Sequence, residues 1–530
     1  MRIAQAYLAL VLTLALLGLG AATAPAQKYG GTLNALSRGN PANLNIHQTS
    51  TITTVFPMMP IYNNLVLYDQ LKPQESPDTI VPELAESWSW SADHKNLTFR
   101  LHRGVKWHDG KPFTSKDVKM TWDDVRGVSG RRLKLNPRKL WWDNVTDVTT
   151  NGDHEVTFHL KRPQPAILAM LASGYSPVLP AHIEPSRLRT EAIGTGPFKL
   201  HKYERDQKIE LVKNQDYFVK GRPYLDGIHY LTIKSRSSRF AALVANQADI
   251  TFPGETTKPI YEGLQRRNLE LVFHQTIANS SNNVIFNPHK PPFNDERMRV
   301  VVSLALDREG FVKGLRQGGA LQSGALLPPP YGVWGLTQEQ LNSLPGYGDA
   351  RKNKAKAREI MKKLGFGPDK HFKVTISTRA IATYIEMSNW VIAELKDVWI
   401  DAELEQIESG NWYGKLARKD YVMGVNSTGT GPDDPDANFY ENYACGSQRN
   451  YTGYCDPETT ALMERMSAEV NFQKRRQLAQ EIDMKLQREA ARPMLGFRYD
   501  YRTWWNYVKN VVPHQSHYSY HRMQEVWLDK

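Results

Sequence analysis

A single extended apolar segment stands at the N-terminus, and no later run is long enough to cross a bilayer. After Arg2, residues 6–22 are almost free of charge, and Ala24-Pro25-Ala26 follows them. A spanning helix needs roughly 20 apolar residues, so a membrane anchor is the weaker alternative to a signal peptide. We expect residues 1–26 to be cleaved before Gln27. No cysteine stands there to carry a lipid, which favours a free protein in the periplasm.

The exported part is too long for one hydrophobic core. About 500 residues remain after the signal peptide, and a domain typically has roughly 150, so two or three domains are expected. The composition, with 41% hydrophobic and 10% aromatic residues, suits a large globular body.

The chain is basic, since lysine and arginine exceed aspartate and glutamate by 67 − 55 = 12. The densest basic cluster, residues 352–363, has helical spacing and little aromatic interleaving, which favours a solvated helix face over a nucleic-acid patch. We therefore expect no nucleic-acid partner. A basic surface of this kind can steer anionic solutes by long-range attraction.

The only two cysteines, Cys445 and Cys455, lie ten positions apart in a segment rich in Gly, Ser, Asn and Tyr. In an oxidising compartment this spacing favours a local disulfide. Two free thiols, or half of a metal site, are the alternatives. No third cysteine or neighbouring histidine supports a metal.

Strand-like and helix-like stretches alternate irregularly, which indicates a mixed α/β chain. Alternating residues at 97–101 and 155–160 predict half-buried strands, and Thr114 with Asp117 predicts a helix start. These elements form an α+β unit within 70–188. In the last third, helix, strand, helix and strand patterns follow one another over 351–406, as in βαβ units.

A search for catalytic motifs gives no enzyme. The chain has no Gly-x-Ser-x-Gly elbow and no His-Glu-x-x-His helix, and its histidines are scattered. Gly429-Thr430-Gly431 is too short to cradle a phosphate. The carboxylates of Asp433-Asp434-Pro435-Asp436 are best interpreted as part of a turn, because they lack the spacing of a calcium loop or of an acid/base pair.

Five segments together resemble the extracellular solute-binding proteins of the dipeptide, oligopeptide and nickel class, which serve ATP-driven importers. They occur in the family's order across nearly the whole mature chain. They are Pro82–Trp88 (PELAESW), Phe99–Thr114 (FRLHRGVKWHDGKPFT), Gly194–Phe198 (GTGPF), Pro291–Arg299 (PPFNDERMR) and Ala305–Glu309 (ALDRE).

The resemblance implies an α/β fold of the periplasmic binding protein type, with two large lobes, a hinge and an extra α+β lobe. Lobe I would comprise residues 27–69, 189–280 and 500–530. Lobe II, residues 70–188, would be inserted within it, and lobe III would span 281–499. The ligand would lie between lobes I and III and be enclosed by hinge closure.

The resemblance also implies ligand-binding positions. Arg379 follows a predicted strand where dipeptide binders place an arginine for the ligand carboxylate, and a surface arginine is the alternative. The position of the aspartate that pairs with a peptide's amino group falls at Gly431, which weakens peptide specificity unless Asp433 replaces it. Further candidates are Trp412, for which core packing is the alternative, and Asn43, Asn45, His47, Thr428, Gly429 and Thr430.

We therefore expect the substrate-binding component of an ABC importer, a monomer without cofactor or metal that delivers its solute to a membrane permease. The solute would be a peptide, an opine-like compound or another amino-acid or sugar conjugate. The alternatives are a metal or haem carrier of the nickel-binding branch and an exported hydrolase. By analogy with dipeptide binders, the resemblance also favours the Cys445–Cys455 disulfide.

Overall fold

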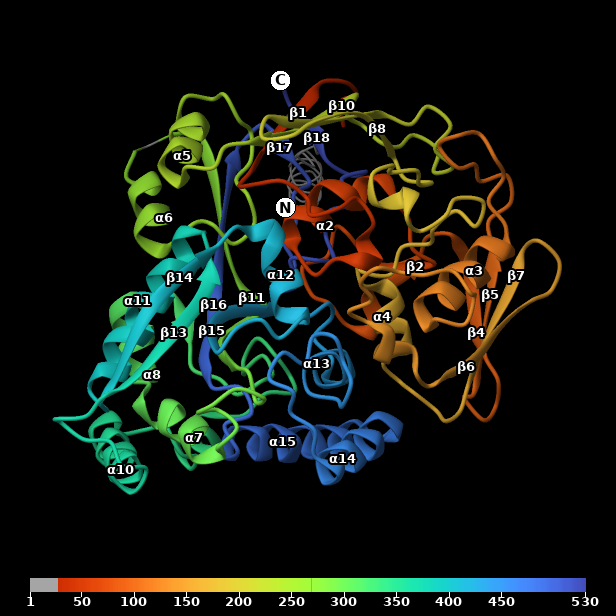
Figure 1. Ribbon diagram of the computed structural model, residues 1–530. Coiled ribbons are helices and arrows are strands. Elements are labelled where there is room, and N and C mark those ends of the chain that lie inside the picture. The colour runs from red at the N-terminus through yellow and green to blue at the C-terminus, as the bar shows by residue number, and fades with distance from the viewer. Residues whose placement is uncertain (1–26, 268) are drawn as a thin grey trace, which may run out of the picture.

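The computed structural model describes residues 27–267 and 269–530 (Figure 1). The predicted signal peptide lies outside the described residues. Within the described part of the chain, none of the helices combines the length and apolar character that crossing a membrane requires.

The first sheet contains four strands in the order β1-β10-β9-β8, at the top of Figure 1. β1 pairs with β10 in parallel, and the other pairs are antiparallel. In the third strand of this order, Ile209 and Leu211 are buried and Glu210 is not, as expected for a sheet with one covered face. The strands are β1 (Thr32–Ser37), β8 (Phe198–Glu204), β9 (Lys208–Lys213) and β10 (Gly227–Thr232).

A second, antiparallel sheet lies at the right of Figure 1, in the order β4-β5-β7-β6. Helix α3 (Ser115–Arg126) begins at a capping box in which the Thr114 amide donates to Asp117 at 2.8 Å, and it ends at Gly127, whose φ of 79° suits glycine. The predicted helix start is confirmed. The strands are β4 (Ala85–Trp90), β5 (Asn96–Leu101), β6 (Val145–Thr150) and β7 (Glu155–Leu160).

The largest sheet has six strands in the order β12-β16-β11-β15-β13-β14. β13 and β14 run parallel and are joined through α11, so the βαβ pattern predicted over 351–406 is confirmed. The strands are β11 (Leu271–Phe286), β12 (Ala320–Leu321), β13 (Phe372–Arg379), β14 (Ile400–Ile407), β15 (Met423–Gly429) and β16 (Met494–Trp505), and the helices near them are α7 (Glu296–Ala305), α10 (Ala350–Lys363) and α11 (Ala382–Lys396).

Strands β11 and β16 connect two separate hydrophobic cores. One core gathers residues from 33–252 with Trp504 and the C-terminal segment, and another gathers residues from 284–425 with Leu495. The two strands pair along both cores, with a register shift between Ile277 and Ser281. The predicted lobe limits at 280/281 and 499/500 fall within these two strands.

The remaining elements are short or belong to the C-terminal third. They are α2 (Ile52–Met58), α4 (Ile167–Ala172), α5 (Arg236–Val244), α6 (Lys258–Gln265), α8 (Arg308–Gly310), α9 (Gln338–Asn342), α12 (Ser409–Ala417), α13 (Pro435–Asn442), α14 (Pro457–Ala468), α15 (Phe472–Arg488), β2 (Val66–Tyr68), β3 (Ile80–Pro82), β17 (Val508–Lys509), β18 (Trp527–Leu528), the 3-10 turns η1 (Ile46–Gln48), η2 (Met59–Ile61), η3 (Pro77–Thr79), η4 (Lys139–Trp142) and η5 (Arg187–Arg189), and the π-helical turn η6 (Phe311–Leu315).

Candidate ligand-binding site

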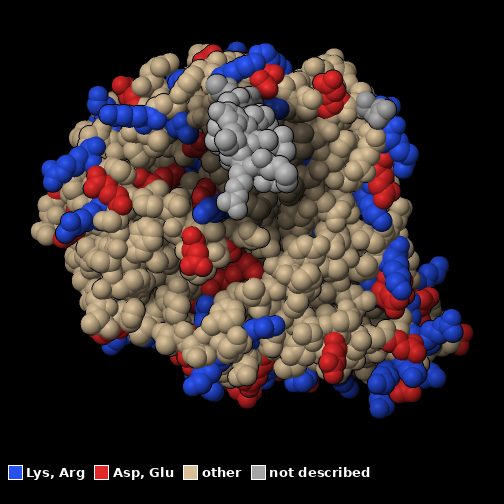
Figure 2. All heavy atoms as spheres, turned by 180° about the vertical axis from the view of Figure 1, so that it is seen from behind, with Lys and Arg blue, Asp and Glu red and all other residues tan. Residues whose placement is uncertain are grey.

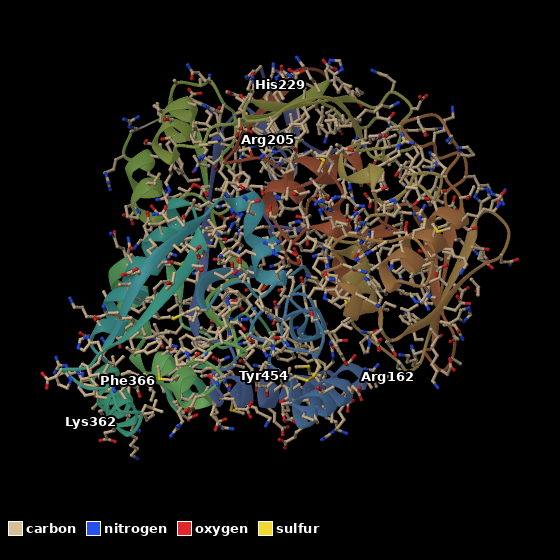
Figure 3. The ribbon with its side chains drawn as sticks, in the orientation of Figure 1. Arg162, Arg205, His229, Lys362, Phe366 and Tyr454 are labelled. Atoms are coloured by element: carbon tan, nitrogen blue, oxygen red, sulfur yellow. A yellow bond between two sulfur atoms is a disulfide. The ribbon has the colours of Figure 1, made fainter. Side chains whose placement is uncertain are left out.

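Two cavities of about 300 Å³ each lie between segments of the first core and segments after residue 380. The Arg38 cavity is lined by residues 38–40, 53, 205–206, 234, 236, 239 and 255 on one side, and by 380–382 and 408–409 on the other. The Arg449 cavity is lined by residues 42–43, 48–51, 134–135, 137 and 189, and opposite them by 410, 413–414, 417–418, 448–449 and 451. Arg205, labelled in the upper part of Figure 3, belongs to the Arg38 cavity.

Arg379 ends β13 and contacts one lining residue of each cavity, although it lines neither cavity itself. Its Nε donates to the hydroxyl of Ser409 at 3.0 Å, and Ser409 lines the Arg38 cavity. Its guanidinium carbon lies 5.7 Å from the centroid of the Tyr413 ring, and Tyr413 lines the Arg449 cavity. Arg379 is only 2% exposed, and no carboxylate of the described residues forms an ion pair with it.

The phenol of Tyr384 completes this arrangement, because it accepts from Nη1 of Arg379 at 3.2 Å. Burial opposes ionisation of Tyr384, but the positive charges of Arg379 and Arg38 outweigh that effect, so its pKa lies below the usual value. The local field is therefore positive, and it favours an anionic group of a ligand.

A second charged cluster surrounds Arg449, and it was not predicted from the sequence. Glu441 of α13 bonds Arg449, and its Oε1 lies 3.7 Å from Nη1 of Arg138. The Arg138 guanidinium stands 3.9 Å from the centroid of Tyr175, whose ring stacks on Tyr518 at 4.6 Å. Several polar atoms of the cluster are buried without a partner in the described residues, among them Nε of both arginines, Oε2 of the glutamate and the Tyr175 hydroxyl.

The glycine loop packs against aromatic rings. A Cβ at Gly429 would lie 2.5 Å from the ring of Tyr518. A Cβ at Gly431 would lie 3.0 Å from Trp141 and closer still to the Ser173 hydroxyl. The position to which the resemblance assigns an aspartate therefore has no room for a side chain in this arrangement.

The two threonines of the loop are buried. The Thr428 hydroxyl accepts from Asn283 at 3.0 Å and from Arg492 at 3.2 Å. Thr430 is 3% exposed. Neither lines the Arg38 or the Arg449 cavity.

Residues 43–47 precede η1 and enter it, and hydrogen bonds among their own side chains and amides hold them. The Asn43 side chain accepts from the Asn45 amide at 2.9 Å, and the Asn45 side chain accepts from the His47 amide at 3.0 Å. His47 Nε2 lies 2.7 Å from the Pro177 carbonyl, and burial lowers its pKa to about 4, so a neutral imidazole donates this bond. Of the three candidates, only Asn43 lines a cavity.

Two other candidates, Trp412 and Asp433, line neither cavity. Trp412 has no exposed surface, donates to Asn426 at 3.2 Å and packs in a small core, as its core alternative expects. Asp433 accepts from the Trp334 indole through its carbonyl at 2.9 Å. Burial, followed by the charge of Asp434, raises the pKa of the Asp433 carboxyl to about 8. Its side chain lines neither cavity, and its replacement of a carboxylate at Gly431 stays a prediction.

The other carboxylates after the glycine loop are structural. Asp434 caps α13 by accepting from the Asp436 amide at 2.9 Å. Arg475 holds Asp434 at 2.7 Å and Asp436 at 3.0 Å. The predicted turn is therefore the start of a helix.

The Cys445–Cys455 disulfide is present, as expected. It closes the loop that carries Arg449. This loop also contacts the segment on the opposite side of the cavity, since the Asn136 amide donates to Gln448 at 2.7 Å. Arg162, labelled at the lower right of Figure 3, makes a similar crossing contact with the Tyr440 hydroxyl at 3.0 Å.

Charge on the surface is dispersed. On the face shown in Figure 2, lysine and arginine lie mostly around the periphery, interspersed with acidic side chains. Among residues 27–267 and 269–530, no group of three or more His, Cys, Asp or Glu side chains is placed to hold a metal ion.

Comparison with known proteins agrees with the fold. Residues 79–450 match the model of the bacterial extracellular solute-binding proteins, family 5 Middle. A dipeptide-binding protein of Escherichia coli K12 is 25% identical over 505 residues, covering 89% of this chain and 90% of that protein.

Two solved structures share the fold. The periplasmic binding protein DppA of Helicobacter pylori, in complex with the peptide STSA, has a TM-score of 0.81 at 22% identity and covers 95% of this chain and 99% of its own. The binding protein AgaA of A. tumefaciens R10, in complex with agropinic acid, has a TM-score of 0.78 at 21% identity, with coverages of 94% and 99%.

Proposed function

The chain belongs to the bacterial extracellular solute-binding proteins of family 5, and from this premise we propose that it captures an acidic amino-acid conjugate in the periplasm. The family consists of solute-binding proteins of ABC transporters and not of enzymes, so the exported hydrolase is set aside. The protein would act as a monomer and deliver its solute to the permease of an importer.

Closure of two halves is the proposed mode of capture. Lobe I (27–69, 189–280 and 500–530), with lobe II (70–188) inserted in it, would move against lobe III (281–499). β11 and β16 pass from one core to the other and are the natural hinge. Closure is favoured only by contacts that the ligand adds to both halves.

The buried guanidinium of Arg379 is the observation that carries the choice of ligand. Other buried arginines have backbone carbonyls around them, such as Arg308 beside the Met494 carbonyl and Arg492 beside the carbonyls of Asn442 and Arg449. Arg379 meets only hydroxyl groups. A buried charge without a counter-charge is costly, and a ligand carboxylate would remove that cost.

Gly431 argues against an ordinary peptide. A free amino group enclosed in the site needs an anionic partner, and no side chain fits at Gly431. Known relatives bind both kinds of solute, since one neighbour holds the peptide STSA and another holds agropinic acid. A conjugate whose amino group is substituted or internally paired, as in an opine, fits a site that has the arginine but lacks the aspartate.

A thermal-shift screen tests the proposal. The probes are dipeptides, oligopeptides, N-carboxyalkyl amino acids, neutral oligosaccharides and divalent metals. A ligand at 100 times its Kd stabilises the native state by about 2.7 kcal/mol, so a binder raises the Tm. We expect N-carboxyalkyl amino acids to raise it.

The variant Arg379→Gln should weaken their binding about 10- to 100-fold, the cost of losing a charged hydrogen-bonded pair. The matched control is Arg351→Gln on the exposed face of α10, which should bind as wild type does. If only neutral sugars bind, and Arg379→Gln binds them equally well, the choice of an acidic ligand is wrong.

A further inference from the structure

The Arg449 cavity has an unbalanced charge. Its lining residues include four cations and, in the described chain, no aspartate or glutamate. The Arg38 cavity differs, because its cations are accompanied by Asp206, Glu255 and Glu408. The four cations are Lys134, Arg189, Arg418 and Arg449.

Arg449 contributes a buried donor that the protein does not use. It is 1% exposed, and Nη1 is engaged by Glu441 and by the Gly429 carbonyl at 3.1 Å. Its Nε and Nη2 are buried and have no acceptor among the described residues. A buried N–H group without an acceptor costs about 1–3 kcal/mol, more when it is charged, so a ligand acceptor here would be stabilising.

The other three cations stand around the cavity without acidic partners. Arg189 donates to the amide oxygen of Gln48 at 3.0 Å, which is a neutral acceptor. Lys134 and Arg418 are exposed, and neither forms an ion pair with any described carboxylate. Positive charges that converge on one hollow raise the local concentration of anions and strengthen their binding.

The Arg449 cavity shares a neighbour with Arg379. Tyr413 lines the cavity, and its ring also lies 5.7 Å from the Arg379 guanidinium carbon. The bond from the Asn136 amide to Gln448 at 2.7 Å joins the two sides at the edge of the cavity. An anion in the cavity would therefore contact both sides and favour the closed arrangement.

We propose that the Arg449 cavity binds an anionic group, a carboxylate or a phosphate, and that the solute therefore carries at least two acidic groups. One acidic group pairs with Arg379 and the other enters the Arg449 cavity. The inference that the solute carries a second acidic group depends on the proposed function, whereas the inference that the cavity binds an anion does not.

Titration with inorganic phosphate tests the cavity by itself. The full mature chain is titrated calorimetrically at low ionic strength with phosphate, and separately with succinate to separate phosphate from carboxylate recognition. We expect Arg418→Gln and Arg189→Gln each to weaken binding of the better anion at least fivefold. Arg351→Gln, an exposed charge removed on α10, should leave the affinity unchanged. Absence of binding by wild type, or equal affinity in all four proteins, overturns the proposal.

A matched pair of conjugates separates this proposal from the proposed function. N-(1-carboxyethyl)-alanine carries two carboxylates, and its monoamide N-(1-carbamoylethyl)-alanine has nearly the same shape but carries one. We expect the dicarboxylate form to bind more tightly in wild type and to lose that advantage in Arg418→Gln. Equal binding of the two forms, lost in Arg379→Gln, would refute the second acidic group and leave the function standing. Anion binding in the cavity with neither conjugate bound would refute the function instead.

Discussion

Replacing Glu441 by glutamine tests whether this buried carboxylate stabilises the buried guanidinium groups of Arg138 and Arg449. Glu441 has no exposed surface, bonds Arg449 and lies 3.7 Å from Arg138. Burial lowers the pKa of the Arg449 guanidinium, but the charge of Glu441 outweighs it and holds that pKa well above the ordinary value. Without the carboxylate, two buried guanidinium groups face each other.

The expected cost follows from this burial. Removing one partner of a buried ion pair costs about 3–5 kcal/mol. The unfolding entropy is about 2 cal/mol/K per residue, and over about 500 residues this gives about 1 kcal/mol per degree. The Tm of Glu441→Gln, followed by circular dichroism without ligand, should therefore fall by about 3–5 °C.

An exposed carboxylate provides the matched control. Glu458 pairs with Lys485 at 2.9 Å but its side chain is 73% exposed, so Glu458→Gln should cost less than about 1 kcal/mol. The double variant Glu441→Gln, Arg449→Gln should lose less stability than the two single losses added together, because each removes the other's unpaired charge. A Glu441→Gln protein that melts within one degree of wild type, as the control should, would refute the reasoning.

Three further predictions concern the glycine loop, its acidic neighbour and the disulfide. Gly431→Asp should keep lobe III apart from lobes I and II, because the new side chain would collide with Trp141. With ligand present, small-angle scattering should give a larger radius of gyration for the variant than for wild type. An unchanged radius would contradict this. In the folded protein the Asp433 carboxyl has a pKa of about 8, above its unfolded value, so the protein loses stability as pH rises from about 4 to about 8. Asp433→Asn should remove that loss and be about 1–3 kcal/mol more stable than wild type at pH 8. Identical pH profiles of the two proteins in urea unfolding would contradict this. Cys445→Ser with Cys455→Ser should cost about 2–3 kcal/mol, because the disulfide closes a short loop, and an unchanged urea midpoint would count against this.

Much of the local structure could be predicted from neighbouring residues. The alternation at Leu97, Phe99 and Leu101 marks a half-buried strand because side chains on a strand point to opposite faces. The capping box at Thr114 and Asp117 marks a helix start because both partners lie within one turn. The Cys445–Cys455 pair was likewise a local feature.

The candidate site was predicted less completely, because its members come from distant segments. Arg379 was a candidate because the family resemblance places an arginine after this predicted strand. Arg138, Glu441 and Tyr518 carry no local pattern that separates them from other polar or aromatic residues, and the fold alone brings them together. Trp412 packs in a small core, which is the alternative that its sequence position left open.

The sequence by itself determined the order of the elements through composition and spacing, and its resemblance to a family indicated the class of protein and the missing carboxylate at Gly431. Only the tertiary structure decided that Gly431 faces Trp141 and that four cations converge on one cavity. Such contacts depend on the path of the chain between distant segments, and sequence spacing does not specify that path.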